Sequence, residues 1–212
     1  MREISVPVEL LRKYPELSVV EVEIARAAQS IIKCFEAGGK LLICGNGGSS
    51  ADSEHIAGEL MKGFEHKRPV AELFGKQLAA KGSERGKYIA SKLQQGFPVI
   101  SLNTHSALIT AVANDIDPDL IFAQQVGVYG RKGDVLLAIS TSGNSRNIID
   151  AIITALAREM TVIGMTGETG GSMKSLCDIL LNVPGTRTSA VQELHLPMYH
   201  AICLMIENYF FN

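Results

Sequence analysis

The chain has no tryptophan, and aromatic residues make up only 6% of its 212 residues. Proteins that bind single-stranded nucleic acids usually stack the bases on aromatic side chains, so this mode of binding is not expected here. The formal net charge is only −2, which argues against a strong electrostatic attraction to nucleic acid or to an anionic membrane surface. We therefore expect no nucleic-acid partner.

Long apolar runs are also missing. No segment reaches the roughly 20 consecutive apolar residues that a membrane-spanning helix needs, and the stretch Met1–Ile4 does not begin a signal peptide. We expect a cytoplasmic protein with no membrane partner. The four cysteines lie far apart and form no C-x-x-C motif, which favours buried thiols over disulfides or a cysteine metal site; they are Cys34, Cys44, Cys177 and Cys203.

The apolar segments that are present predict an α/β fold. With 46% hydrophobic residues, the chain can bury one sizeable core, and we expect a single domain over 1–212. Most of five β-rich segments lack polar alternation, as is typical of strands buried on both faces of a parallel sheet. Helix-compatible segments alternate with them, which predicts a doubly wound parallel sheet flanked by helices. The expected strands are 40–44, 98–102, 134–139, 161–165 and 178–183, and the expected helices are 18–37, 49–63, 106–113, 119–129, 145–159, 171–177 and 190–211.

Two of these segments have unusual compositions. In 66–96, charged and small residues surround a modest apolar stripe, which predicts two short helices broken at Gly82-Ser83. We interpret 66–96 as a helical insertion that either decorates the surface or forms a lid. The segment 190–211 is strongly apolar with few charges. Because such a helix needs neighbours on most sides, we expect burial in the interface of a homo-oligomer, a dimer or tetramer.

Two stretches of the chain repeat one design, in which an apolar run leads into a turn of small polar residues and then into a helix. The first turn is 45–50 (GNGGSS) and the second is 140–145 (STSGNS). Glycine lets the backbone approach a ligand, hydroxyls donate hydrogen bonds, and helix N-termini favour anions. Ligands of parallel sheets bind at the C-terminal ends of strands, where both turns are expected. The pair predicts a site for a phosphorylated or heavily hydroxylated small molecule.

His55 and Glu59 follow the first turn and are four residues apart. On a helix this spacing places both side chains on one face. The arrangement suits a metal site or an acid/base pair, and it is also what an ordinary exposed His–Glu pair shows.

A second group of polar residues lies in the apolar C-terminal segment. Gln192 and His200 are eight residues apart, slightly over two helical turns, and therefore face the same way. His195 lies between them, and Pro197 is expected either to kink the helix or to remove one of its backbone hydrogen bonds. These groups either form part of a site or serve the packing of an interface.

Other polar residues are weaker candidates. Asn114 and Asp115 read as a turn near the C-terminal ends of the strands. Arg187 and Lys62 have the charge to neutralise a phosphate, although a solvated surface charge is the simpler interpretation of each.

Together these stretches resemble the sugar isomerase (SIS) domain family and, within it, the phosphoheptose isomerase branch. The resemblance covers most of the chain apart from 66–96. STSGNS is typical of the SIS fold in general, whereas the combination of H-x3-E with Q-x7-H is more specific to this branch. The stretches that carry it are 44–60 (CGNGGSSADSEHIAGEL), 113–115 (AND), 133–152 (GDVLLAISTSGNSRNIIDAI) and 191–200 (VQELHLPMYH).

The resemblance implies a five-stranded parallel sheet, a homotetramer with active sites between subunits, and one Zn²⁺ ion per subunit. It implies a ketose–aldose isomerisation, of sedoheptulose 7-phosphate to a heptose 7-phosphate, through an enediol(ate). The residues it assigns to the phosphate are Ser140, Thr141, Ser142 and Ser145, and those it assigns to the sugar are Asn46, Gly47, Gly48, Asn114 and Asp115, with His55, Glu59 and Gln192 also in contact with the substrate. The zinc ligands it implies are His55, Glu59, Gln192 and His200. It also implies Glu59 as general base and His200 as general acid.

Other functions stay open at this point. The 66–96 segment is longer than the corresponding connection of the family, which leaves room for an isomerase of a different ketose phosphate. A regulator of replication initiation with the same fold is a non-enzymatic alternative, and it would not require the His, Glu, Gln and His set. A sugar-phosphate-sensing module usually carries an additional DNA-binding domain, for which the chain has no room.

Overall fold

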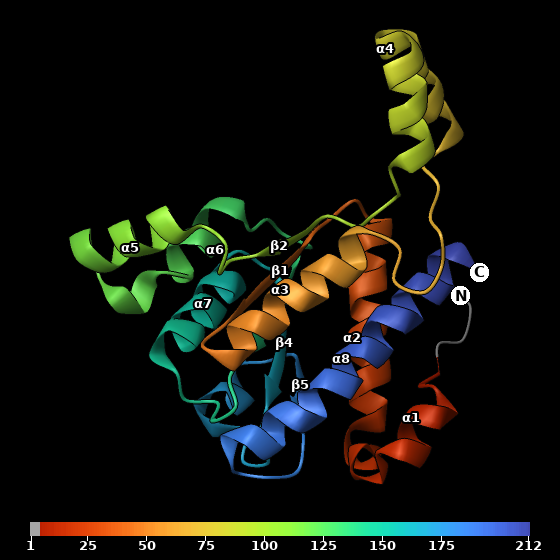
Figure 1. Cartoon of the computed structure of the whole chain (residues 1–212). Coiled ribbons are helices and arrows are strands. Elements are labelled where there is room, and N and C mark those ends of the chain that lie inside the picture. Colours follow the sequence, from red (N-terminus) through yellow and green to blue (C-terminus); the bar gives the residue numbers. More distant parts are fainter. Residues whose placement is uncertain (1–4) are drawn as a thin grey trace.

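The computed structural model describes residues 5–212 and shows a five-stranded sheet between two layers of helices (Figure 1). The stretch Met1–Ile4, considered above for the absence of a signal peptide, lies outside the described residues. All strand pairs are parallel, in the order β2-β1-β3-β4-β5, as the predicted α/β fold requires. The strands are β1 (Leu41–Gly45), β2 (Val99–Ser101), β3 (Val135–Ile139), β4 (Thr161–Thr166) and β5 (Ile179–Asn182).

The predicted helices are present with two differences. The expected helix 119–129 is divided, because the Asp117 side chain accepts from Asp119 N at 2.8 Å and caps a separate short turn. The expected helix 171–177 is only a 3-10 turn that begins at two glycines with positive φ. The helical elements are α1 (Val8–Lys13), η1 (Pro15–Val20), α2 (Glu21–Glu36), α3 (Gly48–Met61), α4 (Glu72–Lys92), α5 (Ser106–Asp115), η2 (Pro118–Leu120), α6 (Ala123–Tyr129), α7 (Arg146–Ala157), η3 (Gly171–Ser175) and α8 (Thr188–Phe211).

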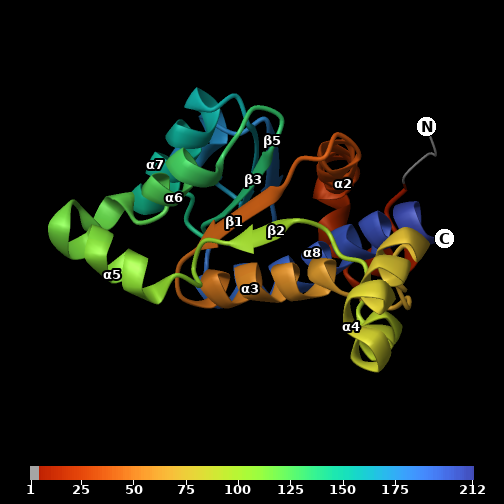
Figure 2. The same cartoon turned by 90° about the horizontal axis from the view of Figure 1, so that it is seen from above.

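The sheet separates two hydrophobic cores. Figure 2 shows α2, α3 and α8 along one face and α6 and α7 along the other. Alternate residues of β3 supply them: Val135 and Leu137 enter the core under α2, α3 and α8, whereas Leu136 and Ala138 enter the core under α6 and α7. Because both faces are buried, the strands need apolar residues at every position, which explains the uninterrupted apolar runs of the sequence.

The strand order decides where the two small-residue turns lie. β1 and β3 are hydrogen-bonded neighbours, although β2 lies between them in the sequence. The chain turns from β1 outward to β2 and returns to β3, so the gap between β1 and β3 is the topological switch point of the sheet. The turns that follow these strands flank this gap.

α8 is a single helix that continues through Pro197. Much of its apolar surface is covered by the chain itself, because α8 packs against α2 and α3 in one layer (Figure 1). Tyr199, Cys203 and Ile206 on this helix are all buried. The apolar composition of 190–211 therefore has an explanation within one subunit, and does not by itself require an oligomer.

α4 is a helical hairpin that projects away from the sheet (Figure 1). Ser83 has a positive φ of 50° and breaks the helix where the sequence predicted it. Small residues let the two arms approach closely, because a Cβ added at Gly86 would lie 2.1 Å from Leu78 O. Leu73 and Tyr88 on the arms are exposed.

Two further findings concern membrane spans and cysteines. Within residues 5–212, no helix is long and apolar enough to cross a membrane. All four cysteines are free thiols, as predicted; Cys34, Cys44 and Cys203 are buried, and Cys177 is half-buried.

Candidate active site

A cavity of about 250 Å³ lies at the switch point and is lined by both small-residue turns. The parallel pairing of β1 with β3 brings the ends of the two strands side by side, and the turns meet there. The residues that line the cavity are Asn46, Gly47, Gly48, Ser49, Ile139, Ser140, Thr141, Ser145, Thr188 and Gln192.

Three helices begin at this cavity. Gly48 is the first residue of α3, Ser145 is the N-cap of α7, and Thr188 is the first residue of α8. Each helix directs the positive end of its dipole toward its N-terminus. Hydroxyl groups and three such termini around one small cavity suit a phosphate group.

Within the second turn, the structure separates the predicted phosphate ligands. Ser140 Oγ and Ser145 Oγ lie 3.2 Å apart at the cavity, with Thr141 beside them. Ser142 does not line the cavity; its hydroxyl accepts from Asn144 N at 3.2 Å and shapes the turn. Of the four predicted hydroxyls, three therefore face the cavity.

Gly48 and Gln192 are in close contact at the edge of the cavity. A Cβ added at Gly48 would lie 2.4 Å from Gln192 Nε2. The missing side chain at Gly48 thus leaves the space that the Gln192 amide occupies beside the cavity.

Alanine at Gly48 is expected to move Gln192 while leaving the fold intact, because the group that must shift is the end of a long side chain. We expect a KM for the sugar phosphate about tenfold higher or more, since the displaced amide narrows the cavity, which corresponds to about 1.4 kcal/mol of lost binding. Gly58→Ala is the matched control on the same helix, because an added Cβ there meets nothing within 4 Å. An equal KM in the two variants would contradict the placement of Gln192.

A cluster of titratable side chains lies further along α3 and α8. His55 Nε2 is 3.2 Å from Glu59 Oε1, as their spacing on one helical face predicted. The His200 ring comes from α8 and meets the His55 ring edge to face, with centroids 5.0 Å apart. The Phe64 ring also contacts the His200 ring, with centroids 5.4 Å apart. The structure thus brings together His55, Glu59 and His200, which lie on two segments far apart in the sequence.

One histidine of the cluster has a ring nitrogen without a hydrogen-bond partner. Among the described residues, the buried His200 Nε2 has no hydrogen-bond partner. Burial lowers the pKa of His200, with nearby His55 adding to the effect and Glu59 opposing it. Glu59 also forms an ion pair with Lys62 at 3.3 Å, so this lysine serves the carboxylate and not the cavity between the two turns.

The predicted zinc ligands are only partly gathered. A neutral His55 nitrogen and the Glu59 carboxylate are both electron-pair donors, so their 3.2 Å contact has room for a shared cation, a proton or a metal. Within residues 5–212, however, no three His, Cys, Asp or Glu side chains are arranged so that they could hold a metal ion. Gln192 lies at the cavity near the start of α8, two turns before His200.

α3 and α8 run side by side in the same direction, and this sets the length of the site. Gly48 contacts Gln192 at one end, and His55 Nδ1 contacts Tyr199 Oη at 2.9 Å further along. On each helix, seven residues separate these two contacts, which corresponds to about 10 Å at 1.5 Å per residue. The cavity between the two turns and the His–Glu cluster therefore lie about 10 Å apart along α3.

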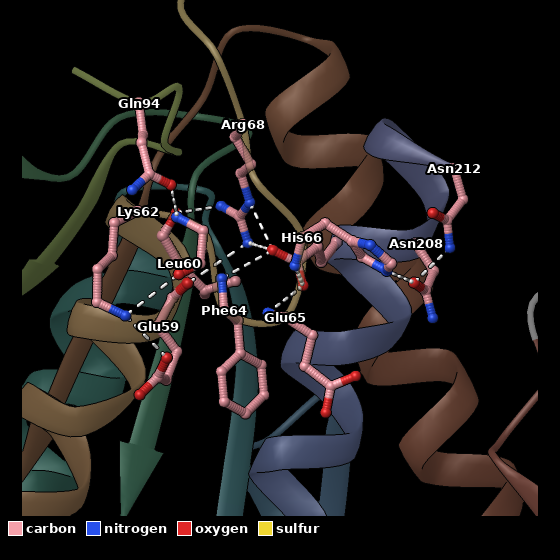
Figure 3. Close-up of polar contacts among 12 residues, drawn as sticks. Glu59, Leu60, Lys62, Phe64, Glu65, His66, Arg68, Gln94, Asn208 and Asn212 are labelled. Atoms are coloured by element: carbon pink, nitrogen blue, oxygen red, sulfur yellow. Dashed lines mark hydrogen bonds and ion pairs between the residues drawn. The ribbon is translucent and has the colours of Figure 1, made fainter. Parts of the chain in front are cut away.

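A buried ion pair fixes the end of α3. Figure 3 shows its arginine, Arg68, next to Glu59 and Leu60 at the end of this helix. Arg68 and Glu207 are both fully buried and lie 2.7 Å apart. The Arg68 guanidinium also donates to Leu60 O and Glu59 O at the end of α3, and the Glu207 carboxylate accepts from Phe64 N at 2.8 Å. These contacts hold Glu59 and Phe64 in place relative to α8.

Several predicted residues lie outside this arrangement in a single subunit. Asn114 and Asp115 form the end of α5, are exposed, and hydrogen-bond to each other at 2.8 Å. Figure 2 shows α5 at the periphery of the molecule, away from α8. Arg187 is exposed at the N-cap of α8, next to the cavity-lining Thr188.

Sequence reasoning missed partners of the predicted residues. Tyr199 contacts both His55 and Asp52. Asn147 exchanges two amide hydrogen bonds with Asn46, at 2.9 and 3.0 Å. Thr188 at the cavity carried a signal, since a Ser or Thr before an apolar helical run marks a helix start. The others have ordinary spacing and become visible only in three dimensions.

His195 does not join the cluster. It is fully buried, its Nε2 contacts Thr166 O at 3.3 Å, and burial lowers its pKa to about 4.

The folded state thus keeps His195 neutral, while the unfolded chain takes up a proton on this residue below about pH 6.5. We expect this residue to cost about 2 kcal/mol of stability between pH 7 and pH 5. Urea unfolding of the wild type and His195→Gln at both pH values measures this cost, and an equal loss in both proteins would contradict it.

The fold and the site define an α/β protein with a cavity suited to a phosphorylated small molecule and with a His–Glu cluster further along the same helices. The family model described as the SIS domain matches residues 17–99 and 94–167. A phosphoheptose isomerase from Laribacter hongkongensis is 40% identical over 190 residues, covering 88% of this chain and 84% of the relative. The chain therefore belongs to the SIS-domain family, in its phosphoheptose isomerase branch.

Solved structures are similar over almost the whole chain. A phosphoheptose isomerase from Neisseria gonorrhoeae is 35% identical, with a TM-score of 0.73 and 93% of each chain covered. One from Francisella tularensis is 32% identical, with a TM-score of 0.74 and 94% of this chain and 93% of that chain covered. The predicted family and fold are thereby confirmed.

Proposed function

We propose that this isomerase interconverts sedoheptulose 7-phosphate and an aldoheptose 7-phosphate through an enediol(ate). The relatives support the reaction, and the observation that carries the assignment of the site is its two-ended form. A phosphate in the cavity beside Ser140 and Ser145 leaves about 10 Å along α3 to the His55–Glu59 level. An extended sugar with its phosphate at the last carbon can reach across this distance with its carbonyl end at the cluster.

The chemistry follows from the residues at that end. The reaction removes a proton from the carbon next to the carbonyl and returns it to the neighbouring carbon. Glu59 is the proposed base, since a positioned carboxylate can carry this proton. His200, kept neutral by its lowered pKa, is proposed to exchange protons with the substrate oxygens. The cavity holds the phosphate and orients the sugar without taking part in proton transfer.

We further propose that the cluster binds one zinc ion per subunit, with His55, Glu59, Gln192 and His200 as ligands. The 3.2 Å contact of His55 Nε2 with Glu59 and the unpartnered His200 Nε2 support this donor set. The side chains must move closer together than they are here. When bound, zinc supplies Lewis-acid polarisation of the substrate oxygens.

The remaining expectations stay proposals. We propose a homotetramer in which a neighbouring subunit completes the site, because Asn114 and Asp115 are exposed on α5 and do not line the cavity of their own subunit. The cytoplasmic location, the single domain over 1–212 and the interpretation of 66–96 as an insertion also remain predictions.

Hydrogen exchange tests the reaction and its substrate together. Purified protein supplied with zinc is incubated in heavy water with sedoheptulose 7-phosphate and with shorter ketose phosphates. We expect solvent deuterium at C2 of the aldose product, fastest with the seven-carbon substrate. Faster exchange with a shorter ketose phosphate would reassign the substrate, and no exchange with any of them would favour a regulatory role for the fold.

A further inference from the structure

The two ring nitrogens of His55 have different partners. His55 Nδ1 lies 2.9 Å from Tyr199 Oη, and His55 Nε2 lies 3.2 Å from Glu59 Oε1. Tyr199 comes from α8 and is 1% exposed, whereas His55 is on α3 and its side chain is 42% exposed. The buried hydroxyl therefore reaches the back of a ring whose other edge faces the site.

A third residue gives this contact a direction. Tyr199 Oη donates to Asp52 Oδ1 at 3.3 Å, and Asp52 lies on α3 one turn before His55. A hydroxyl has one proton to donate. Once that proton is directed to the Asp52 carboxylate, Tyr199 Oη is left as an acceptor toward His55. The hydrogen of a neutral His55 ring then belongs on Nδ1, and its lone pair is on Nε2.

We propose that Tyr199, oriented by Asp52, is a positioning residue that holds His55 in the Nδ1–H tautomer. An imidazole without such a partner carries its proton mainly on Nε2 in water. Fixing the proton on Nδ1 aims the Nε2 lone pair at Glu59, where it can accept a proton or bind a metal ion. Partners of this kind set the tautomer and basicity of histidine ligands in metal sites generally.

Tyr199 also contributes its ring. It packs edge to face on His55, with centroids 5.5 Å apart, and on His200, with centroids 5.0 Å apart. Phenylalanine keeps these contacts and removes only the oxygen. Tyr199→Phe therefore separates the hydrogen bond to His55 from the packing of the three rings.

The tautomer can be observed without turnover. Metal-free protein with ¹⁵N-labelled histidine is measured by long-range ¹H–¹⁵N correlation near neutral pH. We expect the Nδ1–H pattern for His55 in the wild type and a shift toward Nε2–H in Tyr199→Phe. His55 as Nε2–H in the wild type, or an unchanged pattern in the variant, would overturn the proposal.

Two further readouts connect the tautomer to the proposed function, on which its importance rests. In competition with a chromophoric chelator, Tyr199→Phe is expected to bind Zn²⁺ about 10–100-fold more weakly. In the isomerase assay kcat is expected to fall while KM changes little, because the phosphate cavity is untouched. Zinc affinity equal to that of the wild type would contradict the positioning role.

Tyr209→Phe is the matched control. Tyr209 lies on the same helix, and its hydroxyl likewise donates to a carboxylate, that of Glu36 at 2.7 Å. We expect it to leave the His55 tautomer, zinc affinity and kcat unchanged; parallel losses in both variants would show a general effect on α8 and overturn the proposal. The failure of the proposed function looks different: the wild type would show the Nδ1–H tautomer and its loss in Tyr199→Phe, but no isomerisation.

Discussion

Replacing Glu59 with glutamine is expected to lower kcat by about 10²–10⁴-fold, the range that positioned acid–base groups supply. Glutamine has nearly the same shape, but it cannot accept the proton that the reaction removes from the sugar carbon. Because the substitution keeps the size of the side chain and 15% of the Glu59 side chain is exposed, the fold should tolerate the change. Steady-state kinetics with sedoheptulose 7-phosphate measures the effect.

A zinc determination on the same variant separates the two roles proposed for Glu59. If the variant keeps its zinc and loses turnover, the carboxylate acts mainly as the base. If zinc is lost as well, its role as a ligand contributes to the defect. Glu54→Gln, on the exposed part of the same helix, is the control and should retain activity. Full turnover by Glu59→Gln would show that the assigned base is wrong.

Replacing Glu207 with glutamine is expected to destabilise the protein by about 3–5 kcal/mol, because it leaves the Arg68 charge buried without a partner. Both side chains of this pair are fully buried. Burial raises the pKa of Glu207, but the N–H groups of Glu65 and Phe64 and the Arg68 guanidinium outweigh it, so the net pKa is lowered and the carboxylate stays charged. Urea unfolding, read as a shift in midpoint at constant slope, measures the loss.

Two variants test whether the unpaired charge is the cause. Glu9→Gln breaks the exposed Arg12–Glu9 pair and should cost at most about 1 kcal/mol. Adding Arg68→Met to Glu207→Gln removes the stranded charge. The single glutamine oxygen can still accept from Glu65 N and His66 N, which bond to the same oxygen of the Glu207 carboxylate, while Phe64 N loses its acceptor. We therefore expect the double variant to recover part of the stability. A double variant less stable than Glu207→Gln would argue against this explanation.

The fold was predictable because its signals are local. Strands with both faces buried need apolar residues throughout, as in 41–44 and 135–139, and the intervening helices show their own period. Short elements were predicted less well. Asp117 caps a separate turn at Pro118–Leu120, a local signal that the expected single helix over 119–129 did not take into account.

The site was predictable in part for the same reason. His55 and Glu59 share a helical face whatever surrounds them, so their contact follows from spacing. The contact of Tyr199 with His55 joins residues 144 positions apart and has no local signature. The turn 140–145 shows a further limit, because its sequence could not tell that Ser142 supports the turn while Ser145 lines the cavity.

The sequence by itself determined the alternation of buried strands and helices, the two small-residue turns and the family. Tertiary structure decided that the turns share one cavity, since this depends on β1 pairing with β3 and not with β2 alone. It also decided that α3 and α8 lie side by side, which places His200 at His55 and buries Arg68 against Glu207. Contacts between distant segments depend on how all the elements pack together, and local sequence patterns do not encode that packing.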